Sequence, residues 1–559
     1  MKNNFYLIKK DETIKNFIKN FESGILEKNF DIAIALNQNK TLKGIISLGD
    51  LRRLVNKKLD QALFIANYLN KDPITVTEND LNSNLYSKLY FLRKNKKKKI
   101  SKVIILDENK KFKFILDFKD IENNYLYKKI CIVGLGHIGL PLALHFLKKT
   151  DTVCGVDKDK KKIKDLKNLH LNFYEKNLYE SLIFNLKQKK LLISSDFNND
   201  TSEIYVVCLG TKFVKNKIDN RDLLKLAQQI GKKIKEKDLI ILRGTVQLGA
   251  TRNIFLKGLK KSTKLVCGKD YSLSYMPERL VEGDALAEME TIPTLVSGFS
   301  QSCLNNALNF TKSYFNNYLP VKSFEEAEII KLASNTYRDF KFAFANEISR
   351  IANLNNLSGA ELIRKANFGY SRNDIPKPSL GVGGFCLPKD PYLFSKSLSN
   401  KGNFNLDFNS RKINNSSLIL NYKKIKKIFN IKKTLIGKNV LICGIAFKGY
   451  PETLDTRNSP AIELGKNLKK NNFTLTFIDP LSKMFKKDKS LNHFKIVEKI
   501  DNLNLFDGVI IVNNHEFFLK AISNNLKINK AKKRKIIFDT WGILDKDFVE
   551  KNNWEYYKL

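Results

Sequence analysis

A cysteine at the end of a glycine-rich run is the side chain of this sequence best suited to covalent chemistry. Cys386 follows Gly383, Gly384 and Phe385, and Asp390 lies four residues further on. Glycines allow a backbone to approach a ligand closely, and a thiolate near a lysine can act as a nucleophile. A single cysteine is more often a buried structural residue, so this motif predicts a nucleophile only together with other features.

A polar pair lies on the predicted helix over residues 325–347. Lys331 and Asn335 are four residues apart, which places them on one face of that helix. An ammonium group and an amide on one face could stabilise a developing oxyanion. For an isolated Lys/Asn pair, the competing interpretation of a solvated helix face is preferred.

The strongest local motif is the fingerprint of a dinucleotide site. An apolar strand over 130–133 precedes a glycine-rich turn and a helix over 140–147, and a second strand, 152–156, ends at Asp157. The turn has the sequence Gly134-Leu135-Gly136-His137-Ile138-Gly139. Its glycines permit close approach of a pyrophosphate to the helix N-terminus. Asp157 lies where a carboxylate accepts ribose hydroxyls and repels a 2′-phosphate, so the sequence predicts NAD rather than NADP.

These residues must be positioned by elements that alternate between strands and helices in two parts of the chain. Residues 128–323 have the pattern of a parallel NAD-binding Rossmann domain, and the alternation resumes over 432–559. Residues 324–431 are predicted to be mostly helical. The expected fold class is α/β, with two Rossmann-like parallel-sheet domains, a central helical region between them, and an α+β pair in front.

In that N-terminal pair, residues 1–124, the order helix, strand, turn, strand, helix is predicted twice. The first helix of the second copy is expected over 84–94. The arrangement resembles a tandem pair of CBS domains. The first copy carries Gly44, Ser47 and Asp50 in the spacing G-x-x-[ST]-x-x-D. The resemblance implies that the hydroxyl and the carboxylate hold a nucleotide ribose, and an adenine nucleotide is the candidate ligand.

The second copy of the pair has lost this pattern. Phe114, Asp117 and Asp120 stand at the three positions, and a carboxylate in place of the hydroxyl would repel phosphate. We therefore expect at most one nucleotide per pair. The alternative interpretation is a pair that serves packing or dimerisation and binds no ligand.

Composition excludes several classes of protein. The chain has 559 residues, 43% of them hydrophobic, and no apolar stretch long enough for a membrane helix or a signal sequence, so we expect a cytoplasmic protein without a membrane partner. The net charge of +42 comes from 85 lysines and only 14 arginines spread along the chain. Scattered lysines without a recognition module argue against a nucleic-acid partner. Seven dispersed cysteines and five histidines predict no disulfide scaffold and no metal site.

From residue 128 onwards the chain resembles the UDP-glucose/GDP-mannose dehydrogenase family. Four further segments match family motifs, in family order: Ile240–Val246, Tyr275–Gly283, Gly444–Lys448 and Asp455–Pro460. Together with the motifs above, they extend over about 430 residues. The resemblance implies that NAD is the cofactor, that 432–559 bind a UDP-sugar, and that the central region builds a homodimer or a higher homo-oligomer.

The family oxidises the C6 alcohol of a nucleotide sugar to a carboxylate and reduces two NAD. By resemblance, Cys386 forms a thiohemiacetal with the intermediate aldehyde, and then a thioester that water hydrolyses. Lys331 and Asn335 match the oxyanion-stabilising and sugar-binding pair, and Asp390 matches the carboxylate paired with that lysine. Glu278 matches the carboxylate at the hydrolytic water, with Thr211 near it.

The resemblance assigns the remaining contacts as follows. The cofactor residues are Gly134, Gly136, His137, Ile138, Gly139, Asp157, Thr245, Glu282 and Arg457. The sugar nucleotide is expected to contact Gly383, Gly384 and Lys448 besides Lys331 and Asn335. Three positions depart from the family pattern: Lys212 replaces a proline, Phe385 replaces a histidine, and Trp541 stands where a basic residue is common. Trp541 could stack on uracil or pack in the core.

The substrate subclass has alternatives. Residues 327–347 and 539–542 are most similar to the UDP-N-acetyl-D-mannosamine dehydrogenases, a branch of the UDP-hexosamine dehydrogenases. UDP-glucose and UDP-N-acetylglucosamine 6-dehydrogenases are the alternatives. A different class would be a catalytically inactive, nucleotide-sensing regulatory protein, and the intact set of Cys386, Lys331, Asn335 and Asp390 argues against it.

Overall fold

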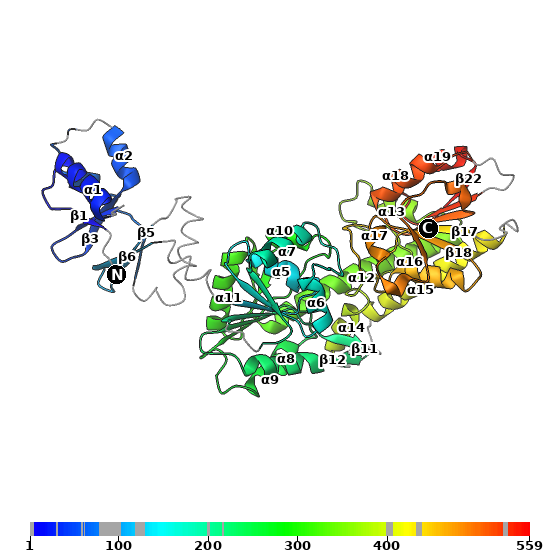
Figure 1. The fold of residues 1–559 in the computed structure, drawn as a ribbon, viewed down its shortest axis with the longest axis horizontal. Coiled ribbons are helices and arrows are strands. Elements are labelled where there is room, and N and C mark those ends of the chain that lie inside the picture. The colour runs from blue at the N-terminus through cyan, green and yellow to red at the C-terminus, as the bar shows by residue number, and fades with distance from the viewer. Residues whose placement is uncertain are drawn as a thin grey trace. The chain divides into compact units, whose positions relative to one another are not determined.

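The computed structural model describes residues 5–28, 32–56, 60, 62–77, 102–117, 129–197, 202–214, 217–398, 406–431, 439–528 and 535–559. The chain divides into two compact units, each described by itself below (Figure 1). One unit comprises Met1–Lys128 with Asn305–Tyr314, and the other comprises Lys129–Leu304 with Phe315–Leu559. The predicted helix over 84–94, the residue Asp120 and the predicted end of the N-terminal pair at residue 124 lie outside the described residues.

The N-terminal unit contains the same three-stranded sheet twice. In each sheet the first strand pairs in parallel with the second, and the second pairs antiparallel with the third. The strands are β1 (Tyr6–Leu7), β2 (Ile32–Leu36) and β3 (Leu42–Ser47), and then β4 (Thr75–Thr77), β5 (Lys102–Leu106) and β6 (Phe112–Asp117). Lys40 and Lys110, at equivalent turn positions, both have positive φ. The described residues therefore contain the internal repeat that the sequence predicts.

The helices of the first copy are α1 (Ile14–Lys28) and α2 (Leu48–Asn56), with the short η1 (Ile65–Tyr68) before β4. Phe17 and Phe21 are one turn apart on α1, fully buried, and stack on each other at 5.1 Å. Ala33 and Ile46 of the sheet belong to the same apolar cluster. Burial of this helix face against the sheet supplies the core of the first copy.

A six-stranded, fully parallel sheet forms the first α/β domain of the second unit. Its strand order is β14-β13-β10-β7-β8-β9, the order of a dinucleotide-binding Rossmann fold. The strands are β7 (Ile130–Val133), β8 (Val153–Val156), β9 (Leu191–Ser194), β10 (Ile204–Val207), β13 (Leu239–Leu242) and β14 (Ser272–Tyr275). Its helices are α5 (Gly139–Phe146), α6 (Lys160–Lys167), α7 (Leu178–Lys187), α8 (Arg221–Gly231), α9 (Lys257–Lys260) and α10 (Ala285–Thr291). The helix α11 (Gln301–Tyr314) belongs to the first unit from Asn305 onwards.

Four smaller strands and one irregular helix complete this domain. The hairpin of β11 (Lys212–Val214) and β12 (Lys217–Asp219) follows β10, and β15 (Thr294–Val296) pairs in parallel with β16 (Tyr318–Pro320). A π-helical turn, η3 (Thr251–Leu256), leads into α9.

The second α/β domain repeats the six-stranded order. Its parallel sheet is β19-β18-β17-β20-β21-β22, which is topologically equivalent to the first sheet. The strands are β17 (Asn439–Cys443), β18 (Thr474–Ile478), β19 (Lys495–Val497), β20 (Gly508–Ile511), β21 (Lys535–Asp539) and β22 (Trp554–Lys558). Its helices are α16 (Pro460–Lys469), α17 (Ser482–Phe485), α18 (Glu516–Asn525), α19 (Lys546–Lys551) and the short η5 (Lys489–Leu491) and η6 (Leu503–Leu505).

Both faces of this second sheet are covered. Val440 and Ile442 belong to one apolar cluster, whereas Leu441 and Cys443 belong to another on the opposite face. Parallel strands with two buried faces are continuous apolar runs, which explains why β17 shows no alternation in its sequence.

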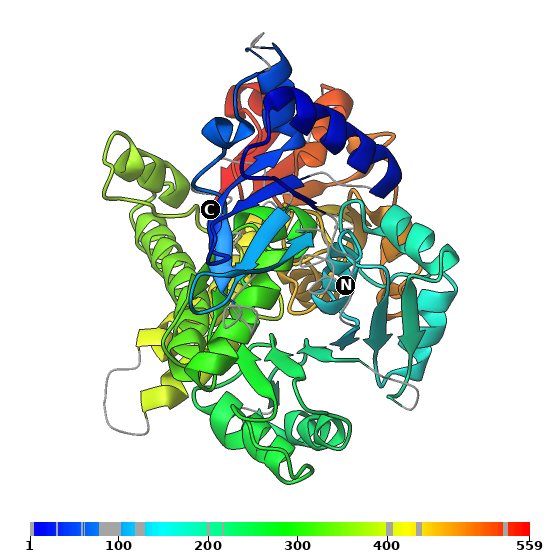
Figure 2. The same ribbon diagram turned by 90° about the vertical axis from the view of Figure 1, so that its left-hand side faces the viewer.

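In the described part of the chain, four α-helices, two of them long, connect the two α/β domains. They are α12 (Phe324–Leu354), α13 (Gly359–Asn367), α14 (Asp390–Ser395) with η4 (Lys396–Leu398), and α15 (Leu406–Ile431). Ser323 caps α12 by accepting a hydrogen bond from Glu326 N. α12 and α15 are joined by side-chain hydrogen bonds and can be followed, in green and yellow, in Figure 1 and Figure 2. Among the described helices, none combines the length and the apolar character needed to cross a bilayer.

Candidate active site

The cysteine loop, residues 379–389, presents Cys386 at the start of α14. Its carbonyl oxygen accepts hydrogen bonds from Lys389 N at 3.0 Å and from Asp390 N at 2.8 Å. Cys386 is exposed to solvent, whereas Lys389 and Asp390 are buried. The turn before α14 therefore places an accessible thiol directly beside a buried ammonium group and a buried carboxylate.

Two glycines allow the cysteine loop to contact the second α/β domain. A Cβ on Gly383 would lie 2.4 Å from Asn458 O, and Gly384 has a φ of 86°. Gly384 N donates to Arg457 O at 2.9 Å, and Asn458 Nδ2 donates to Gly384 O at 2.9 Å. The segment after β17 thus holds the loop two residues before Cys386. A contact of these glycines with substrate stays a prediction.

Two carboxylates organise the polar groups around the thiol. Lys331 Nζ lies 3.2 Å from Glu278 Oε1. Asn335 Nδ2 donates to Asp390 Oδ2 at 2.6 Å, and Lys389 Nζ donates to Asp390 Oδ1 at 2.6 Å. The family resemblance implies that Asp390 pairs with Lys331. In the structure Lys331 pairs with Glu278 instead, and Asp390 accepts from Asn335 and Lys389.

The pKa values of Lys331 and Cys386 are both raised, for different reasons. Burial disfavours the ammonium form of Lys331, but the nearby Glu278, Cys386 and Asp390 outweigh it and raise the pKa of Lys331. Desolvation and then Asp390 raise the pKa of Cys386 to about 11, while Lys331 lowers it. Cys386 is accessible to solvent, so its desolvation comes from protein atoms packed on one side of the thiol and not from complete burial. Lys331 stays charged at neutral pH and is suited to stabilise an anion, whereas Cys386 rests as a thiol.

The glycine-rich turn after β7 is shaped for a phosphate group. A Cβ on Gly139 would lie 1.8 Å from Gly134 O, so only glycine fits there, and Gly134 has a φ of 96°. A Cβ on Gly136 would meet nothing within 4 Å, which leaves open space before the first turn of α5. These features fit the pyrophosphate of NAD.

Asp157 lies at the end of β8, as predicted for the ribose carboxylate. Its Oδ2 atom accepts from Leu135 N at 3.0 Å and from Lys162 Nζ at 2.7 Å, and its Oδ1 atom accepts from Asp159 N at 3.1 Å. The bond to Leu135 ties the carboxylate to the glycine-rich turn. Lys162, which sequence reasoning missed, partly neutralises the charge that would reject a 2′-phosphate.

Replacing Asp157 with asparagine should weaken the preference for NAD over NADP. We expect the KM for NAD⁺ to rise by about tenfold, since a charged hydrogen-bond acceptor for ribose is lost. NADP⁺ use should improve, because Lys162 becomes available to a 2′-phosphate. Steady-state kinetics with both cofactors measures this, with Asp159→Asn, the N-cap of α6, as the matched control. Unchanged kinetics would place Asp157 away from the ribose.

Glu282 connects the cofactor turn to the second α/β domain. Its Oε1 atom lies 2.9 Å from His137 Nδ1 and accepts from Thr453 Oγ1 at 2.5 Å, and its backbone oxygen accepts from Lys448 Nζ at 2.5 Å. Arg457 lies 4.0 Å from the carboxylate. Burial opposes the charge of Glu282, but these partners outweigh it and lower its pKa. Predicted cofactor and substrate residues thus meet at one carboxylate.

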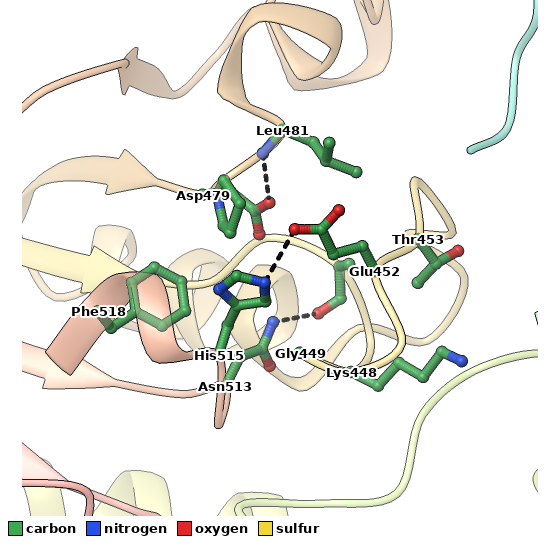
Figure 3. Close-up of a pocket in the computed structure, with 11 residues that line it drawn as sticks. Lys448, Gly449, Glu452, Thr453, Asp479, Leu481, Asn513, His515 and Phe518 are labelled. Atoms are coloured by element: carbon green, nitrogen blue, oxygen red, sulfur yellow. Dashed lines mark hydrogen bonds and ion pairs between the residues drawn. The ribbon is translucent and has the colours of Figure 1, made fainter. Parts of the chain in front are cut away.

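A small pocket lies at the carboxyl ends of β17, β18 and β20 (Figure 3). Asp479 Oδ2 accepts from Ile445 N at 2.9 Å, in the same way that Asp157 accepts from Leu135 in the first domain. His515 Nε2 lies 2.9 Å from Glu452 Oε1. Ligands of open α/β sheets bind where the strand order reverses, and this pocket lies at such a point. Its lining residues are Ala446, Lys448, Gly449, Glu452, Thr453, Asp479, Pro480, Leu481, Asn513, His515 and Phe518.

The titratable groups of this pocket are perturbed by burial. Burial raises the pKa of Asp479 to about 6, against the opposing effect of its backbone hydrogen bonds and of His515. Burial also lowers the pKa of Lys448 to about 8. At neutral pH the pocket therefore holds a lysine that loses its proton readily and gains stability from a bound anion.

The hydrogen bonds of Thr211 join it to two other loops of the first α/β domain. Thr211 N donates to Thr245 O at 2.9 Å, so these two predicted residues are adjacent. The Thr211 hydroxyl, however, donates to Asn220 Oδ1 at 3.0 Å rather than to Glu278. The role of Thr211 near the hydrolytic water stays a prediction.

The three departures from the family pattern have local partners. Lys212 Nζ forms an ion pair with Asp222 at 2.6 Å. The Phe385 ring lies 4.5 Å from the guanidinium carbon of Arg457. Trp541 Nε1 donates to Val512 O at 2.6 Å, which favours the packing interpretation of this side chain over stacking on uracil.

Sequence reasoning missed Asp479, Asn513 and His515. Asp479 does have a signal in the sequence. It directly follows the apolar strand β18, as Asp157 directly follows β8, and in both domains a glycine directly follows the preceding strand. Asn513 and His515 carry no such signal, since they follow β20 in a loop that only the sheet order places beside Gly444. Within the described ranges, no three His, Cys, Asp or Glu side chains gather as metal ligands.

In the N-terminal unit, Ser47 and Asp50 bond to each other. Ser47 Oγ donates to Asp50 Oδ2 at 2.7 Å, and Asp50 N donates to Ser47 Oγ at 3.3 Å. This is a capping arrangement at the start of α2. Burial opposes the charge of Asp50, but Ser47 and Arg53 outweigh it and lower the pKa of Asp50. The motif thus has a structural role whether or not a nucleotide binds.

Three family models match the second unit in order. Residues 128–313 match the NAD binding domain of the UDP-glucose/GDP-mannose dehydrogenase family, 325–416 match its central domain, and 441–546 match its UDP binding domain. The matched segments begin at residue 128.

Relatives of known name agree with these models. The UDP-N-acetyl-D-mannosamine dehydrogenase of Methanocaldococcus jannaschii is 30% identical over 444 residues, which is 78% of this chain and 98% of the relative. The solved structure of the enzyme of that name from Pyrococcus horikoshii has a TM-score of 0.64 at 25% identity, and covers 77% of this chain and 98% of its own. That of Cap5O from Staphylococcus aureus has a TM-score of 0.62 at 26% identity, with the same coverage.

Proposed function

The chain belongs to the UDP-glucose/GDP-mannose dehydrogenase family, whose members are NAD-dependent oxidoreductases, and from this premise we propose that it oxidises C6 of UDP-N-acetyl-D-mannosamine to the uronate. The observation that carries the proposal is the cluster of an accessible Cys386 with the charged Lys331, the Asn335–Asp390 pair and Glu278. The names of the relatives support the sugar.

The first oxidation converts the C6 alcohol to an aldehyde and releases one proton. The glycine-rich turn and Asp157 would hold NAD⁺, which would supply the hydride acceptor for both oxidations. Lys331 is an ammonium group, so its part is to stabilise the alkoxide that forms as the proton leaves. Asn335, one turn further along the helix, donates its amide to Asp390, which fixes the orientation of the Asn335 side chain.

The second oxidation requires a covalent intermediate. Cys386 adds its sulfur to the aldehyde carbon, and the thiol proton moves to the new hydroxyl, which gives a thiohemiacetal. Loss of the hydride from C6 and of the proton from the hydroxyl oxygen yields a thioester. The thioester keeps the reactive aldehyde from leaving the site, which is the physical advantage of a nucleophile here.

Hydrolysis then releases the acid. Glu278 is suited to orient a water molecule at the thioester carbon, because it lies within 3.2 Å of Lys331 and is nearly buried. Water adds, the carbon–sulfur bond breaks, and Cys386 regains its proton. The carboxylate product leaves with the UDP moiety.

We propose that the UDP moiety binds at the carboxyl ends of β17, β18 and β20, beside the small pocket of Figure 3. Lys448 supplies the positive charge, and its lowered pKa indicates a desolvated ammonium group that a phosphate would stabilise. The match of 441–546 to a UDP binding domain supports this.

A homodimer through α12 is a further part of the proposal. Tyr337, Phe344 and Ile351 repeat every seven residues on α12, and their side chains are 59%, 49% and 55% exposed. An apolar stripe of this spacing on a long helix is suited to pack against a second copy. Light scattering of the full chain measures this assembly, and a monomer at micromolar concentration would exclude it.

The test of the proposed function is NADH formation against a panel of UDP- and GDP-sugars. We expect UDP-N-acetyl-D-mannosamine to give the highest kcat/KM, above UDP-N-acetylglucosamine and UDP-glucose, and GDP-mannose to give the lowest. A preference for UDP-glucose would overturn the assigned sugar and leave the family unaffected.

The panel also tests the proposed adenine nucleotide in residues 1–124. AMP, ADP and ATP are added to parallel assays, with Asp50→Ala as the control. A change in KM for the sugar that Asp50→Ala removes would support a nucleotide at Ser47 and Asp50. No change with any nucleotide at millimolar concentration would leave the repeat as a structural module.

A further inference from the structure

A chain of buried hydrogen bonds leads from the centre of the helical region to the cysteine loop. Asp339 of α12 accepts at Oδ1 from Arg411 NH1 at 2.5 Å and from Asn414 Nδ2 at 2.9 Å, both on α15. Asn346 Nδ2, two turns further along α12, donates to Asn414 Oδ1 at 3.0 Å. Asn346 Oδ1 then accepts from Ser379 N, the first amide of the loop, at 2.8 Å.

The groups at the two ends of this series of hydrogen bonds determine which atom donates and which accepts at each link. A backbone N–H such as that of Ser379 can only donate, and the carboxylate of Asp339 can only accept. Both amides between them must therefore point their oxygen toward the loop and their NH₂ toward Asp339. All four side chains are at least 94% buried, so a lost link would leave a buried polar group without its partner.

The hydrogen-bond chain holds the first amide of the loop, and Leu380 beside it packs in the apolar core of the second domain. At the other end, Gly384 is bonded to Arg457 and Asn458. Between these two anchors lie Gly381 and Gly383, which give the backbone little stiffness of its own. The position of Cys386 relative to Lys331 therefore depends on both anchors, and Lys331 lies on the same α12 helix as Asp339 and Asn346.

We propose that Asn346 and Asn414 are positioning residues of the oxidation. Through their hydrogen bonds, the Asp339–Arg411 ion pair fixes the position of Ser379 N. This keeps Cys386 at a constant position relative to Lys331, which lies on the same helix as Asp339. This inference rests on the proposed role of Cys386 as the nucleophile. Neither asparagine touches the reacting atoms.

The test uses the full-length protein with Asn346→Leu and Asn414→Ala. Either change should lower kcat by about 10- to 100-fold, the effect of displacing a reacting group by about 1 Å. The KM for NAD⁺ should stay within twofold, because the glycine-rich turn after β7 is untouched. At pH 8 the alkylation of Cys386 by iodoacetamide, followed on its peptide, should slow several-fold as the thiol loses the influence of Lys331.

The matched control is Asn353→Ala. Asn353 also joins α12 to α15, by accepting from Lys424 Nζ at 2.5 Å, but it has no bond to the cysteine loop. A similar loss of melting temperature with kcat within twofold of the unmodified enzyme is expected for it. If Asn346→Leu does not fold, Asn414→Ala is compared with the control instead, because Asn414 does not itself bond to the loop.

Two outcomes would overturn the inference. One is a kcat of Asn346→Leu or Asn414→Ala no lower than that of Asn353→Ala, and the other is an unchanged rate of Cys386 alkylation in both. Failure of the proposed nucleophile is distinguishable, because Cys386→Ser would then retain turnover whatever the asparagine variants do.

Discussion

Cys386→Ser should abolish sustained formation of the acid while NAD⁺ still binds. The first oxidation needs no sulfur, but the second needs a thiohemiacetal that can lose a hydride and a thioester that water can cleave. A serine hydroxyl is a weaker nucleophile, and the ester that it would form is hydrolysed more slowly. We expect a fall in steady-state rate of at least about 10⁴-fold, the size seen when a covalent nucleophile is removed. The unmodified enzyme should form two NADH per sugar oxidised.

Coupled measurement of NADH and uronate decides this prediction, with NAD⁺ affinity from tryptophan fluorescence or calorimetry. Cys154→Ser, which changes a half-buried thiol of β8, is the matched control and should keep most of the activity. Acid production by Cys386→Ser at a near-normal rate would contradict the thioester route.

Lys331→Met should reduce kcat by about 10²- to 10³-fold, which is the effect of removing one oxyanion donor from a desolvated site. Methionine keeps the length and the apolar stem of the side chain but loses the charge. Glu278 then lacks the partner that lies 3.2 Å away, so the hydrolytic step should slow as well. Steady-state and single-turnover kinetics together separate the two effects.

The same variant makes a prediction about pH. Lys331 lowers the pKa of Cys386, which is about 11 in the unmodified chain, so removing its charge should raise that pKa further. Below the pKa the thiolate fraction falls tenfold for each unit of the rise. Alkylation of Cys386 at pH 9 should therefore be slower in Lys331→Met than in the unmodified enzyme, and the rate should still climb with pH at pH 11.

The control for both effects is Lys424→Met. Lys424 is a partly buried lysine of α15 whose pKa is lowered by burial, and it lies outside the proposed site. We expect kcat and alkylation of Cys386 to stay within about twofold. A pH profile of Cys386 alkylation that Lys331→Met leaves unmoved would show that the ammonium group does not act on the thiol.

Local patterns in the sequence were sufficient for the cofactor turn. The glycines at 134, 136 and 139 and the carboxylate at 157 lie within one strand–turn–helix–strand unit, whose geometry is set by short-range sterics and by burial of apolar strands. The repeat of residues 1–124 could be predicted for the same reason, because each copy is a short unit with its own alternating pattern. The family motifs likewise predict that Cys386, Lys331 and Asn335 belong to one site.

Only the tertiary structure decided which of these groups are partners. Lys331 meets Glu278, 53 residues away in sequence, rather than Asp390, because the reach of a long side chain across two elements depends on how they pack. The Asn346–Asn414 link and the Asp479 pocket were likewise absent from the sequence analysis, since buried amides have no pattern that names their partner. Hydrogen bonds between distant elements are selected by burial, where each donor must find the acceptor that packing brings to it.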